Sequence, residues 1–335
     1  MPRPISEQVV VVTGASSGIG RETALRFARQ GARVVLVARN QEALREVERE
    51  IRDAGGSALV VPADVSDFNQ LNQAARQAVD TYGRIDTWVN NAAVVVYGTF
   101  EQIPIDQFRR VVDVNLMGQV HGARAALPHL KAAGGGTLIG IGSTFSEVPM
   151  PLQSAYVATK HALKGFYDTL RLEQEHERSG VQVSFVMPAS VDTPLFDHAI
   201  SHLGVKPGPV PPVYEPGLVA DAVLHAAQHP VRDMVVGGGG AALTTLERVW
   251  PRAGDAVIRQ MAFTQQQSDV PEPPTGPNNL WQPVPGKGSI HGGYRTMPFD
   301  PYSWVRLHPA AGSAIAGLAL LGLAIPLAGL LRDRR

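Results

Sequence analysis

Short runs of apolar residues recur along the first two thirds of the chain, and segments with helical periodicity separate them. The runs lie at residues 9–12, 33–37, 58–62, 85–89, 137–142 and 234–237. Segments 21–30, 41–54 and 219–229 repeat their apolar positions at the spacing of an amphipathic helix. Strands that are buried on both faces form continuous apolar runs, and alternation with helices is typical of parallel sheets. The pattern therefore predicts a single α/β domain, a doubly wound parallel sheet of the Rossmann type.

A glycine-rich turn joins the first expected strand to the first expected helix. Residues 13–20 read Thr-Gly-Ala-Ser-Ser-Gly-Ile-Gly, and Gly31 follows the helix as a C-terminal cap would. Glycines let the backbone approach a pyrophosphate, and a helix N-terminus offers free N–H groups and a positive dipole end. A plain tight turn is the alternative, but the flanking strand and helix favour a nucleotide site. We assign it to Gly14, Ser16, Ser17, Gly18, Ile19 and Gly20.

The second expected strand ends at a basic side chain, in the place where an acidic side chain would bind the ribose hydroxyls of a dinucleotide. Strand 33–37 leads into Ala38-Arg39-Asn40. The planar guanidinium of Arg39 can pair with a 2′-phosphate, which predicts that NADP(H) is favoured over NAD(H). The alternative role for Arg39 is to solvate or cap the helix at 41–54.

Tyr156 and Lys160 stand four residues apart, so a helix would place them on one face. A free tyrosine has a pKa of about 10, and a neighbouring ammonium would stabilise its phenolate. Taken alone, such a pair is common on solvated helix faces. Its position after the α/β pattern makes it a candidate for proton transfer.

Together these motifs resemble the short-chain dehydrogenase/reductase family over residues 5–240. The loop Thr13-Gly-x-x-x-Gly-x-Gly20 is similar to the family's cofactor loop, and Asn90-Asn-Ala to a second family motif. The resemblance implies a catalytic tetrad of Asn115, Ser143, Tyr156 and Lys160, with Ser143 thirteen positions before Tyr156. It also implies cofactor contacts at Asp64, Val65, Asn91, Tyr156, Lys160, Pro188 and Thr193.

These roles imply hydride transfer between NADP(H) and a carbonyl or alcohol carbon. Tyr156 would donate the proton, Ser143 would hold the substrate oxygen, and Asn115 would position a water next to Lys160. Two positions depart from the family pattern, because Ala93 and Ala189 replace glycines. Two other functions remain open. One is a catalytically weak dinucleotide-binding scaffold or redox-sensing protein, and the other is an isomerase or epimerase on the same fold.

The composition limits which classes of molecule the protein is expected to bind. Thirty basic and thirty acidic side chains give zero formal net charge, and no basic stripe is present, so nucleic acid is not expected to bind. The chain has no cysteine, which excludes disulfides and thiolate catalysis. The ten histidines show no metal-binding spacing, so no metal site is expected. We expect a small-molecule substrate and, from the resemblance alone, a homo-oligomer.

The α/β pattern becomes harder to follow after Pro188. The proline-rich stretch 193–216 is expected to form a substrate lid for a lipophilic substrate, or a simple connector. We divide the chain into a catalytic domain at 1–260, a Pro/Gly-rich extension at 261–309, an apolar segment at 310–331 and a basic tail at 332–335. The extension contains aromatic residues that profit from burial, so it is either a linker or an arm that adheres to the domain.

Residues 310–331 carry no charge over 22 positions and as a helix would span about 33 Å. This length predicts a transmembrane or membrane-attaching helix, and a buried oligomerisation helix is the alternative. No apolar signal precedes the first strand. We therefore expect a membrane-associated protein whose catalytic domain lies in the cytoplasm, although three terminal arginines oppose full crossing.

Overall fold

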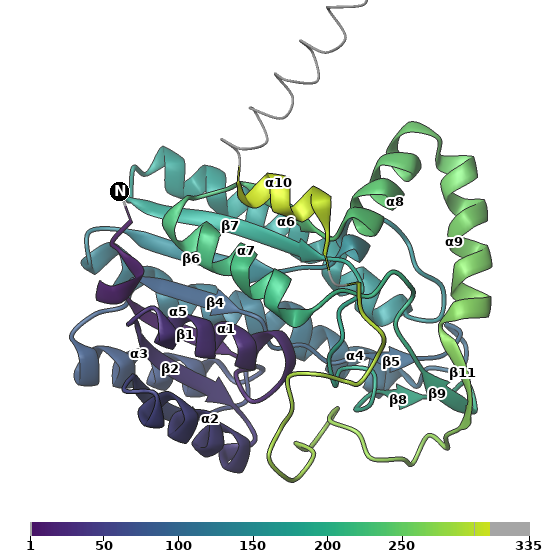
Figure 1. Cartoon of the computed structure of the whole chain (residues 1–335), viewed down its shortest axis with the longest axis horizontal. Helices are drawn as coiled ribbons and strands as arrows, with labels where there is room; N and C mark the ends of the chain where they lie inside the picture. Colours follow the sequence, from purple (N-terminus) through teal and green to yellow (C-terminus); the bar gives the residue numbers. More distant parts are fainter. Residues whose placement is uncertain (1, 298, 309–335) are drawn as a thin grey trace, which may run out of the picture.

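The computed structural model describes residues 2–297 and 299–308. Its centre is a seven-stranded sheet in the order β10-β7-β6-β4-β1-β2-β3, and every neighbouring pair is parallel (Figure 1). The order reverses at β1, as in a doubly wound fold. The strands are β1 (Val9–Thr13), β2 (Arg33–Ala38), β3 (Ser57–Pro62), β4 (Thr87–Asn90), β6 (Gly136–Ile141), β7 (Val181–Pro188) and β10 (Asp233–Val236).

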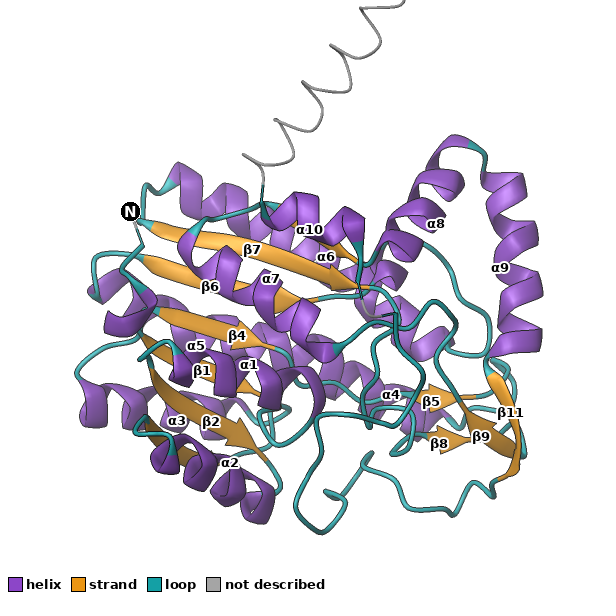
Figure 2. Ribbon diagram, in the orientation of Figure 1, coloured by secondary structure: helices purple, strands orange, loops and turns teal. Residues whose placement is uncertain are grey.

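Helices cover both faces of this sheet (Figure 2). One face is covered by α1 (Gly18–Arg29), α2 (Gln41–Asp53) and α7 (Pro216–Gln228). The opposite face is covered by α3 (Phe68–Tyr82), α4 (Ile105–Val112), α5 (Gly118–Ala132) and α6 (Ser154–His176). Single turns lie at Ile5–Glu7, Asp113–Met117 and Thr144–Ser146. The predicted doubly wound parallel sheet is confirmed.

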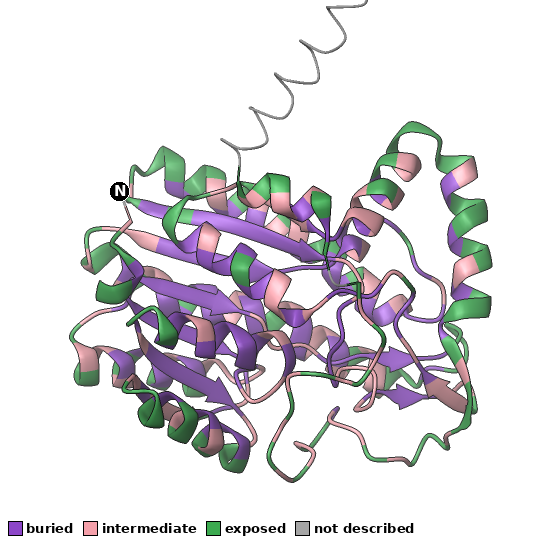
Figure 3. Cartoon of the chain, in the orientation of Figure 1, coloured by how far each residue is buried: buried purple, intermediate pink, exposed green. Residues whose placement is uncertain are grey.

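The core consists of two layers because side chains alternate along each strand. Val9 and Val11 of β1 pack with the α3–α6 side, whereas Val10 and Val12 pack with the α1, α2 and α7 side. All four are fully buried. Central strands with two apolar faces explain the continuous runs in the sequence, and Figure 3 shows these strands as the buried centre of the molecule.

The sequence did not predict two helices that follow β10, the last strand of the sheet. They are α8 (Gly238–Val249) and α9 (Pro251–Gln265), which pack against each other beside the sheet (Figure 1). Helix α9 runs through residue 260, the expected end of the catalytic domain. The loop after β7 contains β8 (Ile200–Ser201) and β9 (Val205–Pro207). These strands pair with β5 (Val96–Tyr97) and β11 (Gln267–Pro271) respectively.

The extension adheres to the catalytic domain. After β11 the chain runs without helix or strand to α10 (Pro301–Leu307) and passes the carboxyl ends of the strands (yellow-green in Figure 1). It is therefore an arm and not a free linker. The apolar segment 310–331 and the basic tail 332–335 lie outside the described residues. Within the part that is described, no helix has the length and apolarity to cross a bilayer.

Candidate active site

The β1–α1 turn is fixed at the carboxyl edge of the sheet by hydrogen bonds to the turn after β4. The Thr13 hydroxyl accepts a bond from the Asn91 N–H at 2.9 Å, and the Asn91 amide donates to the Thr13 carbonyl at 3.0 Å. Gly14 has a φ of +68°, and a Cβ there would lie 2.8 Å from the Asn91 amide nitrogen. Only glycine fits this position, which brings the two turns into direct contact.

Helix α1 begins at this turn, and its first residues, Gly18 and Ile19, line the cavity at this edge. The N–H of Arg21 bonds to the Ser17 carbonyl. Ile19 and Gly20 lie in the same first turn, where N–H groups lack intrahelical acceptors. Such a terminus stabilises a phosphate. The turn therefore fits the pyrophosphate of a dinucleotide.

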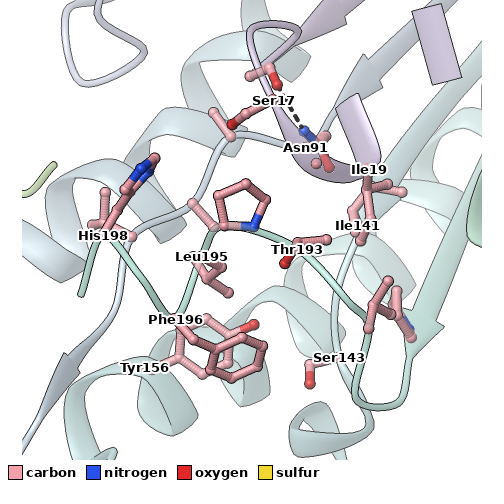
Figure 4. A pocket seen from close by; sticks show the side chains of 18 of the residues that line it. Ser17, Ile19, Asn91, Ile141, Ser143, Tyr156, Thr193, Leu195, Phe196 and His198 are labelled. Atoms are coloured by element: carbon pink, nitrogen blue, oxygen red, sulfur yellow. Dashed lines mark hydrogen bonds between the residues drawn. The ribbon is translucent and has the colours of Figure 1, made fainter. Parts of the chain in front are cut away.

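One continuous cavity of about 510 Å³ runs along this edge. Ser16 and Arg39 line one end, and Tyr156 and Ser143 line the other. Figure 4 shows Ser17, Ile19, Asn91, Thr193, Ser143 and Tyr156 around the same space. Of the residues assigned from the sequence, those that line the cavity are Gly14, Ser16, Ser17, Gly18, Ile19, Arg39, Asp64, Val65, Asn91, Ser143, Tyr156, Lys160, Pro188 and Thr193.

Two assigned residues lie outside the lining. Gly20 packs beneath the turn, where a Cβ would lie 2.2 Å from the Gly14 carbonyl oxygen. Asn115 is fully buried, and its side chain bonds to the backbone of Val94 and donates to the Thr159 hydroxyl at 3.4 Å. It accepts from the Val94 N–H at 2.8 Å and donates to the Val94 carbonyl at 2.9 Å. Asn115 therefore braces a segment that lines the cavity, and its expected water-positioning role remains a prediction.

Helix α6 brings Tyr156 and Lys160 together, as their spacing predicts. The Lys160 ammonium lies 5.3 Å from the centre of the Tyr156 ring and donates to the Ile141 carbonyl at 2.9 Å. Ser143 follows β6 and caps the single turn at 144–146, where its hydroxyl accepts from the Phe145 N–H. The serine and the tyrosine thus converge from two different elements.

Burial controls the protonation of this pair. It raises the pKa of Tyr156 to about 12, while the Ser143 hydroxyl acts in the opposite direction. It lowers the pKa of Lys160 to about 7. The sequence predicts that Lys160 lowers the pKa of Tyr156, whereas in the structure burial raises that pKa. The reason is that desolvation disfavours both charged forms, and the Lys160 ammonium donates to the neutral Ile141 carbonyl.

Two arginines define the other end of the cavity. The Arg110 guanidinium donates to the Asp64 carboxylate at 2.6 Å, and Arg39 lies 3.9 Å from the same group. Burial alone would raise the pKa of Asp64, but hydrogen bonds from Arg110 and Ser66 outweigh it and lower the pKa. The Asp64 carboxylate is therefore ionised, and Arg110 balances its negative charge. Arg39 also donates to the carbonyls of residues 279–281.

Sequence reasoning missed several residues of this site. Asn279, Pro283, Val284, Pro285, Lys287, Gly288 and Ser289 of the extension line the cavity, as do Met150, Leu243 and Met261. The aromatic residues of the extension were the available signal that it packs on the domain. They did not indicate which surface it covers.

The chain matches the short chain dehydrogenase family over residues 8–203. It is 37% identical to the uncharacterized oxidoreductase YxnA of Bacillus subtilis over 322 residues, which covers 94% of this chain and 90% of the relative. It is 36% identical to dehydrogenase/reductase SDR family member 7B of Mus musculus over 206 residues, covering 60% of this chain and 62% of that protein.

Two solved structures have the same fold. A short-chain dehydrogenase/reductase from Mycobacterium marinum aligns with a TM-score of 0.62 at 28% identity, covering 70% of this chain and 95% of that one. A metagenomic short-chain oxidoreductase in complex with NADP aligns with a TM-score of 0.60 at 33% identity, covering 70% and 98%. This chain belongs to the short-chain dehydrogenase/reductase family and is an oxidoreductase of that type.

Proposed function

We propose that this protein transfers a hydride between NADP(H) and a lipophilic carbonyl compound or the corresponding alcohol. The observation that carries the proposal is the single cavity that joins the helix α1 N-terminus and Arg39 to Tyr156 and Ser143. A dinucleotide bound along it would place its phosphates at the helix terminus. Its reactive ring would then lie beside the two hydroxyl groups.

The side chains divide the chemistry between them. A bound nicotinamide supplies or accepts the hydride. Tyr156 donates its phenolic proton to the substrate oxygen in reduction, and Ser143 donates a hydrogen bond to the same oxygen. Lys160 stabilises the phenolate left behind, because its ammonium lies on the same helix face. Asn115 keeps the Val94 backbone in place and so shapes the cavity wall.

Arg39 supports the preference for NADP(H). A guanidinium has five N–H donors, and the three carbonyls of the extension occupy part of this set. The remaining donors are available for a 2′-phosphate, and Asp64 is already neutralised by Arg110. No acidic side chain stands at this position to bind the ribose hydroxyls instead.

The lining near Tyr156 supports a lipophilic substrate. Leu195 and Phe196, in the loop after β7, lie near Tyr156 in Figure 4. Met150, Leu243 and Met261 add apolar surface from other elements. The stretch 193–216 therefore contributes to the substrate end of the cavity, as the lid interpretation expects.

A panel of ketones, aldehydes and alcohols, assayed with NADPH and with NADH, tests the proposal through absorbance of the reduced cofactor. We expect turnover of apolar carbonyl compounds with NADPH. Tyr156→Phe should bind NADPH with near wild-type affinity and lose activity by about 10²–10⁴-fold. Unchanged turnover in this variant would contradict the mechanism. Arg39→Gln should raise the KM for NADPH without raising the KM for NADH.

A catalytically weak dinucleotide-binding protein is the second candidate, because burial holds the Tyr156 pKa at about 12 and makes the phenolate costly. Tight NADPH binding with no turnover across the panel would favour it. Isomerase or epimerase activity would appear as product formation without net consumption of the cofactor.

A further inference from the structure

The extension contacts the parts of the molecule to which the cofactor roles are assigned. We call residues 277–294 the strap. At one end of the strap, the Arg39 guanidinium donates to the carbonyls of Asn279, Leu280 and Trp281, the last at 3.1 Å. Arg110 donates to the Leu280 carbonyl at 3.0 Å, and the Leu280 side chain is 1% exposed in the core. The strap is therefore anchored where an adenosine ribose would bind.

The middle of the strap lies on the glycine turn and on the start of two helices. The N–H of Gly18 donates to the Ser289 carbonyl at 2.8 Å, and Arg21 donates to the Gly288 carbonyl at 2.7 Å. The Asn40 amide donates to the carbonyls of residues 284 and 286, while its oxygen caps helix α2. These are the elements that the fold offers to a pyrophosphate.

The far end of the strap holds the loop after β7. The Asp192 carboxylate is 4% exposed and accepts from the N–H groups of Gly292 and Tyr294 at 3.0 and 2.9 Å. It also lies 3.0 Å from the His291 ring nitrogen. Thr193, the next residue, lines the cavity on the nicotinamide side. The strap thus connects both walls of the cavity.

The strap encloses the cavity without filling it. Strap residues such as Val284 and Lys287 line it together with Ser16 and Tyr156, and about 510 Å³ remains open between them. The two solved neighbours are covered almost completely by 70% of this chain. The other 30% of the sequence lies outside these alignments, and the strap belongs to the C-terminal portion that the family match does not include.

The strap buries little apolar surface. No helix or strand lies between β11 and α10 within the described residues, and Leu280 is the one strap residue there whose side chain is buried. Most of its contacts are hydrogen bonds that its backbone carbonyls accept from side chains of the catalytic domain. Segments with few buried apolar groups open locally at low free energy.

We propose that the strap is a part of the dinucleotide site that closes over the bound cofactor and opens to release it. This inference rests on the proposed function. Cofactor release then requires the strap to leave the glycine turn, so its contacts with Gly18 and Ser16 slow dissociation.

Gly288→Ala tests this directly. A Cβ at residue 288 would lie 2.1 Å from the Ser16 carbonyl oxygen, so the strap must lift from the turn. Gly276→Ala is the matched control, because it makes the same change in the extension outside the cavity lining, where the nearest atom lies 3.3 Å away. NADPH release is measured by stopped-flow fluorescence after mixing the full-length complex with excess NADP⁺.

We expect Gly288→Ala to release NADPH on the order of ten-fold faster, as one or two lost hydrogen bonds would give, and Gly276→Ala to match wild type. Slower release, tighter binding or an unchanged rate in Gly288→Ala would overturn the strap proposal. Wild-type protein that binds neither NADPH nor NADH would overturn the proposed function as well, so the two failures are distinguishable.

Limited trypsin digestion provides a second measurement on the unaltered protein. Lys287 is exposed in the strap, and its peptide bond should be cut more slowly when NADPH holds the strap closed. Lys287→Gln removes this cut and identifies it. Faster or unchanged cleavage at Lys287 with saturating NADPH would contradict closure over the cofactor.

Discussion

Replacing Lys160 with methionine should make the protein more stable while it destroys activity. The Lys160 side chain is 2% exposed, and burial lowers its pKa from 10.5 to about 7. Methionine keeps a similar length without the charge. The interval between the two pKa values corresponds to roughly 5 kcal/mol, at about 1.4 kcal/mol per pH unit.

The lost hydrogen bond reduces this gain only slightly. The Ile141 carbonyl that Lys160 contacts also accepts from the Gln119 amide at 3.0 Å, so it keeps a partner in the variant. Subtracting about 1 kcal/mol for the lost bond leaves a stabilisation of roughly 4 kcal/mol at pH values below 7.

The stability difference between Lys160→Met and wild type should depend on pH. Below about pH 7 both folded and unfolded wild type carry the proton, so the folded state bears the full cost of the buried charge. Between about 7 and 10.5 the unfolded state binds more protons, and the free energy of unfolding of the wild type therefore rises with pH. The variant lacks this rise, so its advantage should shrink toward pH 10.5.

Urea unfolding followed by circular dichroism across this pH window measures the difference. Lys131→Met is the control, because Lys131 forms a surface pair with Glu177 and should change stability by less than about 1 kcal/mol. A Lys160→Met variant that is less stable than wild type below pH 7 would refute the buried-charge argument. So would an advantage that does not diminish as the pH rises.

Two further predictions concern the substrate oxygen and the C-terminal segment. Ser143→Ala should lower kcat by about 10²–10³-fold with little change in NADPH affinity, because it removes one donor to the reacting oxygen; an unchanged kcat would exclude that role. The full chain should stay with membranes after carbonate extraction, whereas a chain that ends at residue 309 should be released, since 310–331 carries no charge; equal release of both would remove the anchor.

The sheet and the proximity of Tyr156 to Lys160 could be predicted because their signals are local. Val9–Val12 and the turn at 13–20 require specific residue types at fixed spacing, and the structure has β1 and α1 there. Tyr156 and Lys160 needed only helical periodicity to meet on one face. The parallel order of the strands then brings these separate segments to one edge.

Helices α8 and α9 could not be predicted with the same rules. Helix α8 begins with three glycines, which are poor helix formers. Few residues of either helix are buried, only Gly240 and Thr244 in α8 and Gly254, Ile258 and Ala262 in α9, so neither helix carries a long row of large apolar residues toward the core. Their packing against each other supplies what local propensity does not.

The strap could not be predicted for a different reason, which lies in how it is held on the catalytic domain. It is held largely through its own backbone carbonyls, and every residue has a carbonyl. The informative side chains stand on the catalytic domain, at Arg39, Asn40, Arg21 and Asp192. Sequence could identify Arg39 as a phosphate-binding candidate but could not show that the guanidinium also binds the strap. Arg39 binds the strap and is also the proposed 2′-phosphate ligand, so under the proposed function we expect strap closure to depend on which dinucleotide is bound.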